Sequence, residues 1–215
     1  MRTFFLAAGV LAAVAAAASP APAESQAQTT TLNFAVLRNG TPIGTSTVRL
    51  RHQGEETVAE IATHIQVKFG YFTLYRFDQT ETERWAVGKL LALNSQTDDN
   101  GTLHKVEVAR SGDSLSIEAD GKRREVDGGV VPASLWNPLL LGRRLALNPQ
   151  DGTISPLSVV DRGHEQLVLQ GRQTTARHYS VKTSFPQDVW YDERNRLIRV
   201  ELSASDGSQI RYQPG

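Results

Sequence analysis

Glu81 and Glu83 form a candidate pair of catalytic carboxylates, because they stand two positions apart in a segment of alternating polarity. Glycosidases use two such acids, one on each side of the scissile bond. Residues two apart on a strand point to the same face, so both acids would lie on one side of any bound sugar ring. We therefore interpret the pair as part of a solvated strand face and predict no catalytic role for it.

Other residue types that could support chemistry are scattered. The five histidines are His52, His64, His104, His164 and His178, and no two of them have the i, i+2 or i, i+4 spacing of metal ligands. The chain has no Cys, so no thiolate can complete a site. Residues 44–48 (GTSTV) lack the second Gly of a nucleophile elbow. The sequence predicts no catalytic residue, metal or cofactor, although a triad assembled in space remains an alternative.

Aromatic and apolar side chains are the stronger candidates for a binding site. A cavity under a short helical lid would be lined by the following residues: Tyr71, Phe72, Tyr75, Phe77, Trp85, Trp136, Leu139, Leu140 and Trp190. Such a cavity would bind an apolar or amphiphilic ligand. The alternative is that these side chains simply fill the core.

Six Asn-Gly or Asp-Gly dipeptides indicate turns between the elements that position these residues. They begin at residues 39, 100, 120, 127, 151 and 206. Tight hairpin turns need positive φ, which Gly adopts freely and Asn or Asp tolerate. Most of these dipeptides are flanked by stretches of alternating polarity, such as 57–69, which is typical of strands with one buried face. The pattern predicts a succession of β-hairpins.

We therefore expect a mainly β domain: an antiparallel meander of about a dozen strands curled into a half or closed barrel. A β-sandwich is the structural alternative. One short helix is expected near 132–141, where Pro132 suits an early helical position and Asn137-Pro138 should kink it or divide it. Both faces of 71–77 carry bulky side chains, so this stretch is either covered on both sides or a lip between strands.

Residues 1–23 have one positive charge at Arg2, an apolar run and the ending Ala21-Pro22-Ala23, which is typical of a secretory signal peptide. We expect a flexible leader at 24–31 and a single β-rich domain at 32–215. The Ala-rich signal suggests export to the periplasm of a Gram-negative bacterium. We predict no membrane span in the mature chain, and its lack of an aromatic girdle disfavours a transmembrane barrel.

The charges balance, with 23 basic and 23 acidic residues, and both signs are interspersed. Nucleic acids require a concentrated positive patch, so we do not expect them as partners. A soluble, disulfide-free exported domain is the class that these properties favour.

Several stretches resemble an uncharacterised family of exported proteobacterial proteins, domain-of-unknown-function family 6134. They are 189–200 (VWYDERNRLIRV) with 206–212 (DGSQIRY), 39–44 (NGTPIG) and 134–137 (SLWN). The chain is also distantly similar to periplasmic lipoprotein-carrier half-barrels, and that resemblance implies an interior that holds acyl chains.

Three functional hypotheses follow. The first is non-catalytic binding of an apolar or amphiphilic ligand between the sheet and the 132–141 segment. The second is an interaction module of the cell envelope that docks a protein partner and has no cavity. The third is a hydrolase with a dispersed site.

Overall fold

The computed structural model describes residues 28–215, which form sixteen strands and one short 3-10 helix. In chain order the elements are β1 (Gln28–Arg38), β2 (Thr41–Gln53), β3 (Glu56–Phe69), β4 (Phe72–Ala86), β5 (Lys89–Asp99), β6 (Thr102–Ser111), β7 (Ser114–Ala119), β8 (Lys122–Asp127), β9 (Val131–Pro132), η1 (Pro138–Gly142), β10 (Leu145–Leu147), β11 (Ile154–Pro156), β12 (Ser158–Leu169), β13 (Arg172–Lys182), β14 (Pro186–Tyr191), β15 (Leu197–Ser203) and β16 (Gln209–Pro214).

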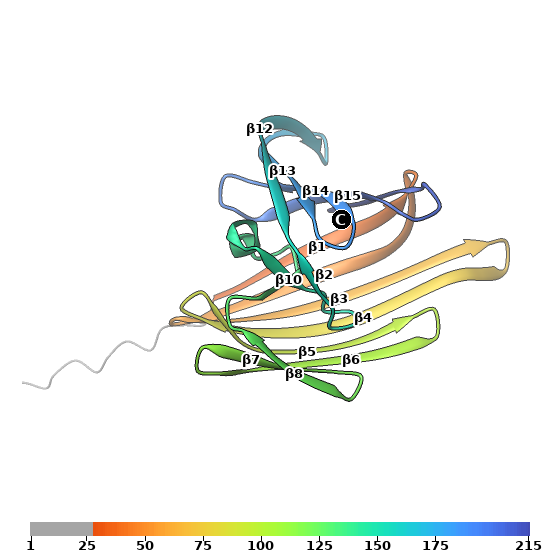
Figure 1. Ribbon diagram of the computed structural model, residues 1–215. Helices are drawn as coiled ribbons and strands as arrows, with labels where there is room; N and C mark the ends of the chain where they lie inside the picture. The colour runs from red at the N-terminus through yellow and green to blue at the C-terminus, as the bar shows by residue number, and fades with distance from the viewer. Residues whose placement is uncertain (1–27) are drawn as a thin grey trace, which may run out of the picture.

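Thirteen strands form one antiparallel sheet in the order β12-β13-β14-β15-β16-β1-β2-β3-β4-β5-β6-β7-β8. Each strand pairs with its neighbour in the chain, except that β1 also pairs with β16, for example at Val36 and Tyr212. The predicted antiparallel meander is confirmed. Within residues 28–215 the edge strands β8 and β12 do not pair with each other, so the sheet curls without closing into a barrel (Figure 1).

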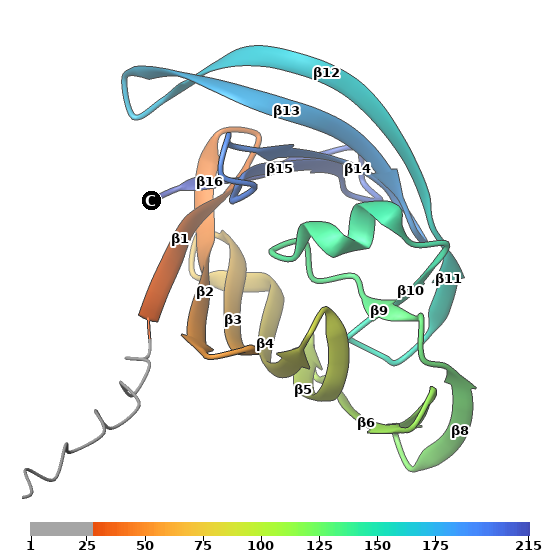
Figure 2. The ribbon, with the colours of Figure 1, turned by 90° about the vertical axis from the view of Figure 1, so that its left-hand side faces the viewer.

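The segment that connects β8 to β12 lies across the open side of this curl (Figure 2). It carries a small second sheet, β9-β10-β11, and the η1 helix. Its residues Val131, Leu140 and Leu147 are buried in one apolar cluster with side chains of β4 to β7. Its residues Leu135 and Trp136 also pack against a second cluster built from β1, β2 and β13 to β15. One segment thus bridges both halves of the sheet.

Three of the Asn-Gly and Asp-Gly dipeptides form hairpin turns in which both residues have positive φ. They are Asn39-Gly40, Asn100-Gly101 and Asp120-Gly121, and this is the conformation that a type I′ turn requires. The β4–β5 and β12–β13 turns have the same φ pattern with Val87-Gly88 and Gln170-Gly171. Positive φ is unfavourable for a β-branched residue such as Val87, so turn chemistry alone does not predict that turn.

The helical stretch is narrower than the sequence pattern predicts. Pro132 ends β9, and the helix covers only Pro138–Gly142. A residue before Pro disfavours the α conformation, so a helix cannot easily run through Asn137. Asn137 instead caps the helix, and its side-chain oxygen accepts a hydrogen bond from the Leu139 backbone N–H at 3.1 Å.

At the N-terminus, β1 begins at Gln28 and pairs with β2 from Gln28 opposite His52 onward. Part of the predicted leader, 28–31, therefore belongs to a strand. The predicted signal peptide and residues 24–27 lie outside the described residues. Over residues 28–215 no helix combines the length and the hydropathy needed to cross a bilayer.

Candidate functional site

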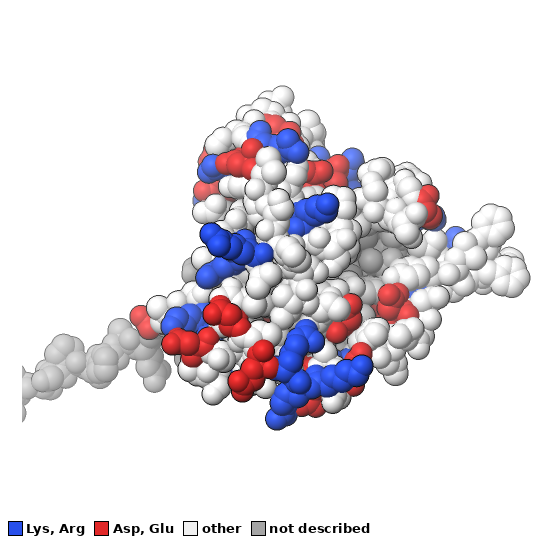
Figure 3. All heavy atoms as spheres, in the orientation of Figure 1, with Lys and Arg blue, Asp and Glu red and all other residues white. Residues whose placement is uncertain are grey.

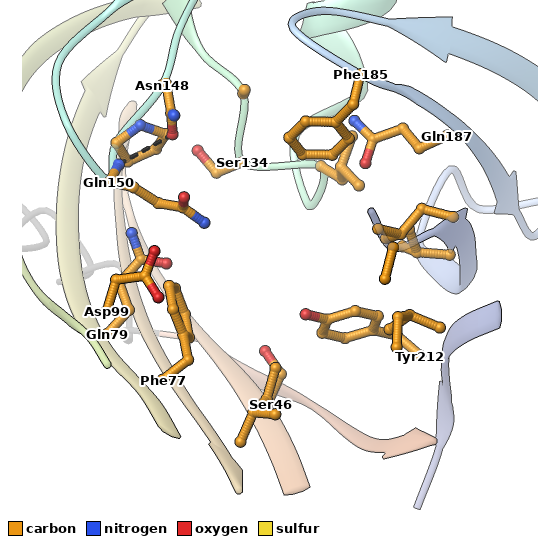
Figure 4. Close-up of a pocket in the computed structure, with 18 of the residues that line it drawn as sticks. Ser46, Phe77, Gln79, Asp99, Ser134, Asn148, Gln150, Phe185, Gln187 and Tyr212 are labelled. Atoms are coloured by element: carbon orange, nitrogen blue, oxygen red, sulfur yellow. Dashed lines mark hydrogen bonds between the residues drawn. The ribbon is translucent and has the colours of Figure 1, made fainter. Parts of the chain in front are cut away.

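A cavity of about 820 Å³ lies between the concave face of the sheet and the segment that bridges it. Figure 4 shows Ser46, Phe77, Ser134, Phe185 and Tyr212 around this hollow, carried by different elements. Strand alternation explains the arrangement, because every second residue of a curled sheet points to its concave face. Strands distant in sequence therefore contribute to one wall.

Most of the cavity wall is apolar. The apolar lining residues include Phe34, Val48, Ile61, Ile65, Phe77, Leu135, Leu197, Val200 and Ile210. Polar lining groups are fewer, and they include Ser46, Gln79, Glu81, Ser134 and Gln187. Burial raises the pKa of the Tyr212 phenol, which also lines the cavity, to about 12. Further polar residues line the cavity, among them the charged Arg38, Asp99 and Asp206. The wall is thus mostly apolar but also carries many hydrogen-bonding groups.

A cluster of polar side chains surrounds Glu83 beside this cavity. Its carboxylate accepts hydrogen bonds from Trp85 Nε1 at 2.5 Å, from Trp136 Nε1 at 3.2 Å and from the Ser134 hydroxyl. The Ser134 hydroxyl also lies 3.4 Å from Glu81 Oε1. The two indole rings meet edge to face, with centroids 6.2 Å apart. These contacts tie β4 to the bridging segment.

Burial raises the pKa of both carboxyls, because it removes them from water. At Glu81 the nearby charge of Glu83 raises the pKa further, well above its ordinary value of 4.5. At Glu83 the hydrogen bonds from Glu81, Ser134 and both indoles oppose the rise. We infer that the pair holds one proton on Glu81 and that Glu83 is the charged acceptor.

The solvated strand face predicted for this pair is therefore wrong. Glu81 and Glu83 are only 4% and 0% exposed. Both belong to the inward face of β4, together with Phe77 and Trp85. Their shared parity with these aromatic residues is the sequence signal that indicates burial, whereas the charge of two carboxylates favours the solvated interpretation.

The predicted ligand-binding residues divide into separate groups. Tyr75, Phe77 and Trp136 line the cavity. Trp85 and Leu140 are buried in the cluster under β4 to β7. Burial and a hydrogen bond to Asp99 raise the pKa of the Tyr75 phenol above its ordinary value.

The other four predicted residues lie elsewhere. Tyr71 and Phe72 are exposed at the β3–β4 turn, and Leu139 is exposed on η1. Trp190 packs with Leu167 and Ala176 in a separate cluster, and its ring stacks on His178. Of the two alternatives for 71–77, coverage on both faces is wrong, because Tyr71, Phe72 and Leu74 are all exposed.

These features define an open, curled β-sheet protein with an internal, largely apolar cavity. The profile of the family described as "Domain of unknown function (DUF6134)" matches residues 34–215, and the chain belongs to this family. No curated protein matches the chain.

A solved structure of similar fold is the β-barrel-like protein of domain of unknown function DUF1849 from Brucella abortus. The TM-score is 0.62 at 7% sequence identity, and the match covers 86% of this chain and 94% of that chain. At this identity the likeness concerns the fold alone.

Proposed function

We propose that this protein is exported to the bacterial periplasm and binds an apolar or amphiphilic molecule in the cavity, without catalysis. The single observation that supports this most is the size of the cavity together with its apolar wall. Ligand pockets typically measure about 300–1,000 Å³ and are lined by apolar side chains with a few polar groups. A cavity of about 820 Å³ is within this range.

The polar lining groups favour an amphiphile over a pure hydrocarbon. Glu81 and Ser134 give the wall hydrogen-bonding groups next to Trp136. A hydroxyl, amide or protonated amine of a ligand would find partners there, while its apolar part would lie against Val48, Ile61 and neighbouring residues.

Export is supported by the signal-peptide pattern of residues 1–23. Secretion of the mature chain into the periplasm, followed by detection of cleavage after Ala23, tests this part of the proposal.

Titration with the fluorescent amphiphile N-phenyl-1-naphthylamine tests the binding function. We expect saturable fluorescence enhancement by the wild-type protein. Ile61→Trp, which adds bulk to the cavity wall, should weaken probe binding about tenfold or more, because it occupies volume that the ligand needs.

Ala62→Trp is the matched control, since Ala62 is the next residue of β3 and is exposed on the opposite face. It should bind the probe as the wild type does. Equal affinities of all three proteins, with each one folded by circular dichroism, would contradict cavity binding and favour an envelope interaction module.

A further inference from the structure

The tip of the β3–β4 hairpin exposes an unusual group of large apolar side chains. Phe69, Tyr71, Phe72 and Leu74 are 75%, 104%, 73% and 60% exposed. The hairpin extends beyond the neighbouring strands in Figure 1, and Figure 3 shows its end free of coloured charges. Exposed apolar groups of this size usually mark an interaction site.

The tip is held by a regular two-residue turn. Phe69 pairs with Phe72, and Gly70 has φ +58° at the first central position, as in a type II′ turn. The ladder continues along β3 and β4 as far as Glu56 opposite Ala86. The apolar side chains are therefore presented on a paired hairpin and not on an irregular loop.

The charged residues within the tip are basic, and acidic residues begin at its base. Between Val67 and Phe77 the only charged residues are Lys68 and Arg76. Arg76 contacts Asp78, and the Tyr75 hydroxyl hydrogen-bonds to Asp99 of β5. Basic side chains that flank exposed aromatic residues suit the phosphate layer of a membrane, where Tyr and Lys or Arg are the usual interfacial residues.

The tip is continuous with the cavity. Val67, Leu74 and Tyr75 line the cavity, and they flank the tip on both strands of the same hairpin. Because Leu74 is exposed and also lines the cavity, it belongs to the cavity mouth.

We propose that the β3–β4 tip inserts its aromatic side chains into the headgroup region of a phospholipid bilayer. This orientation would bring the cavity mouth next to the membrane. If the cavity binds an amphiphile, as proposed above, the ligand would enter directly from the bilayer. A projecting aromatic tip with flanking cations fits a lipid surface better than a flat protein interface, which would require a broader apolar patch.

Flotation with vesicles of phosphatidylethanolamine and phosphatidylglycerol tests this inference. The wild type should float with the vesicles. The partition coefficient of the double variant Tyr71→Ser, Phe72→Ser into the vesicles should be about tenfold lower. The variant has lost two aromatic side chains whose transfer out of water favours binding. Val168→Ser is the matched control, since Val168 is 65% exposed on β12, and it should float normally.

A site-specific label adds a measurement that does not depend on removing the aromatic pair. The chain has no Cys, so Tyr71→Cys or Val168→Cys provides a unique attachment site for an environment-sensitive nitrobenzoxadiazole dye. Vesicles should brighten and blue-shift the dye at position 71 and leave the dye at position 168 unchanged. An unchanged dye at position 71, or tip-dependent self-association without vesicle binding, would overturn the inference.

The two proposals fail in different ways. Ile61→Trp should lose the fluorescent amphiphile and still float, while the tip variant should bind the amphiphile in vesicle-free solution. Flotation of Ile61→Trp without probe binding by any protein would retain the membrane inference and reject the cavity function.

Discussion

At the scale of single residues, Glu81 and Glu83 have the same side chain but different partners. Glu83 accepts three hydrogen bonds from neutral donors. The Ser134 hydroxyl, which lies 3.4 Å from Glu81, has one proton and donates it to Glu83. This difference contributes to the higher pKa of Glu81. It also leads to opposite expectations for the two residues.

In the wild type, the free energy of unfolding should fall as the pH rises toward neutral and alkaline values. Glu81→Gln should make this fall smaller. A carboxyl whose folded-state pKa is raised stabilises the fold fully below the unfolded pKa, near 4.5, and this contribution is lost as pH rises through the folded pKa. Gln resembles the protonated acid and does not ionise. Urea unfolding between pH 5 and pH 9 should show a flatter pH dependence for the variant than for the wild type, and parallel curves would contradict the assignment.

Glu83→Met should destabilise the fold by about 1–3 kcal/mol or more, because the N–H groups of Trp85 and Trp136 lose their acceptor in a buried site. Urea denaturation at pH 7 measures the change. Trp136→Phe in the same background should cost less than it does in the wild type, since its hydrogen bond is already absent. Additive losses would show that the Trp136 hydrogen bond contributes nothing.

At the scale of elements, a buried phenol ties the bridging segment to β14, in addition to the Glu83 contacts that tie it to β4. Tyr191 of β14 donates a hydrogen bond to the Leu135 carbonyl at 2.7 Å, and burial raises the pKa of this phenol above its ordinary value. Leu135 lines the cavity. The contact therefore connects the stability of the fold to the shape of the candidate site.

Tyr191→Phe should lower the unfolding free energy by about 1–3 kcal/mol and weaken probe binding, because the Leu135 carbonyl loses its donor. Thermal denaturation and probe titration measure the two effects. Tyr179→Phe is a suitable control, since the Tyr179 ring lies edge to face with Tyr191 at 6.1 Å and the substitution retains the Tyr191 hydroxyl. Equal effects of both substitutions would refute a specific role for the hydrogen bond.

Local patterns predicted most of the strands, because alternation and turn residues act within a few positions. The inward parity of Phe77 and Trp85 was not predicted, because Glu81 and Glu83 share it and were interpreted as a solvated face. The Asn39-Gly40 hairpin followed from the sequence. The Val87-Gly88 turn did not, since its first residue opposes the required φ. The helix was overextended because Pro132 resembles a helix start, while the restriction at Asn137-Pro138 decides where the helix begins.

The candidate site was predicted only in part, since it depends on contacts between distant strands. Phe77 and Trp136 were expected at the cavity and line it. Tyr71 and Phe72 share the aromatic composition but lie beyond the body of the sheet, where exposure is decided by hairpin length. Glu81 was missed because the partners that allow a carboxyl to be buried come from the bridging segment.

At the scale of the whole molecule, the sheet remains open, and the connection between its edge strands contributes to two apolar clusters. An open curl retains an interior hollow because the bridging segment occupies only part of the concave face. The same hairpin that forms one wall of this hollow also carries the exposed aromatic tip. Cavity and tip are therefore two parts of one proposed activity, the handling of an amphiphile at a membrane surface.

The most direct test of the central claim is native mass spectrometry of the gently purified protein, followed by lipid extraction. We predict a bound amphiphile in the wild type and in Ala62→Trp, and its absence in Ile61→Trp. A ligand-free mass of the wild-type protein in every preparation would contradict the account.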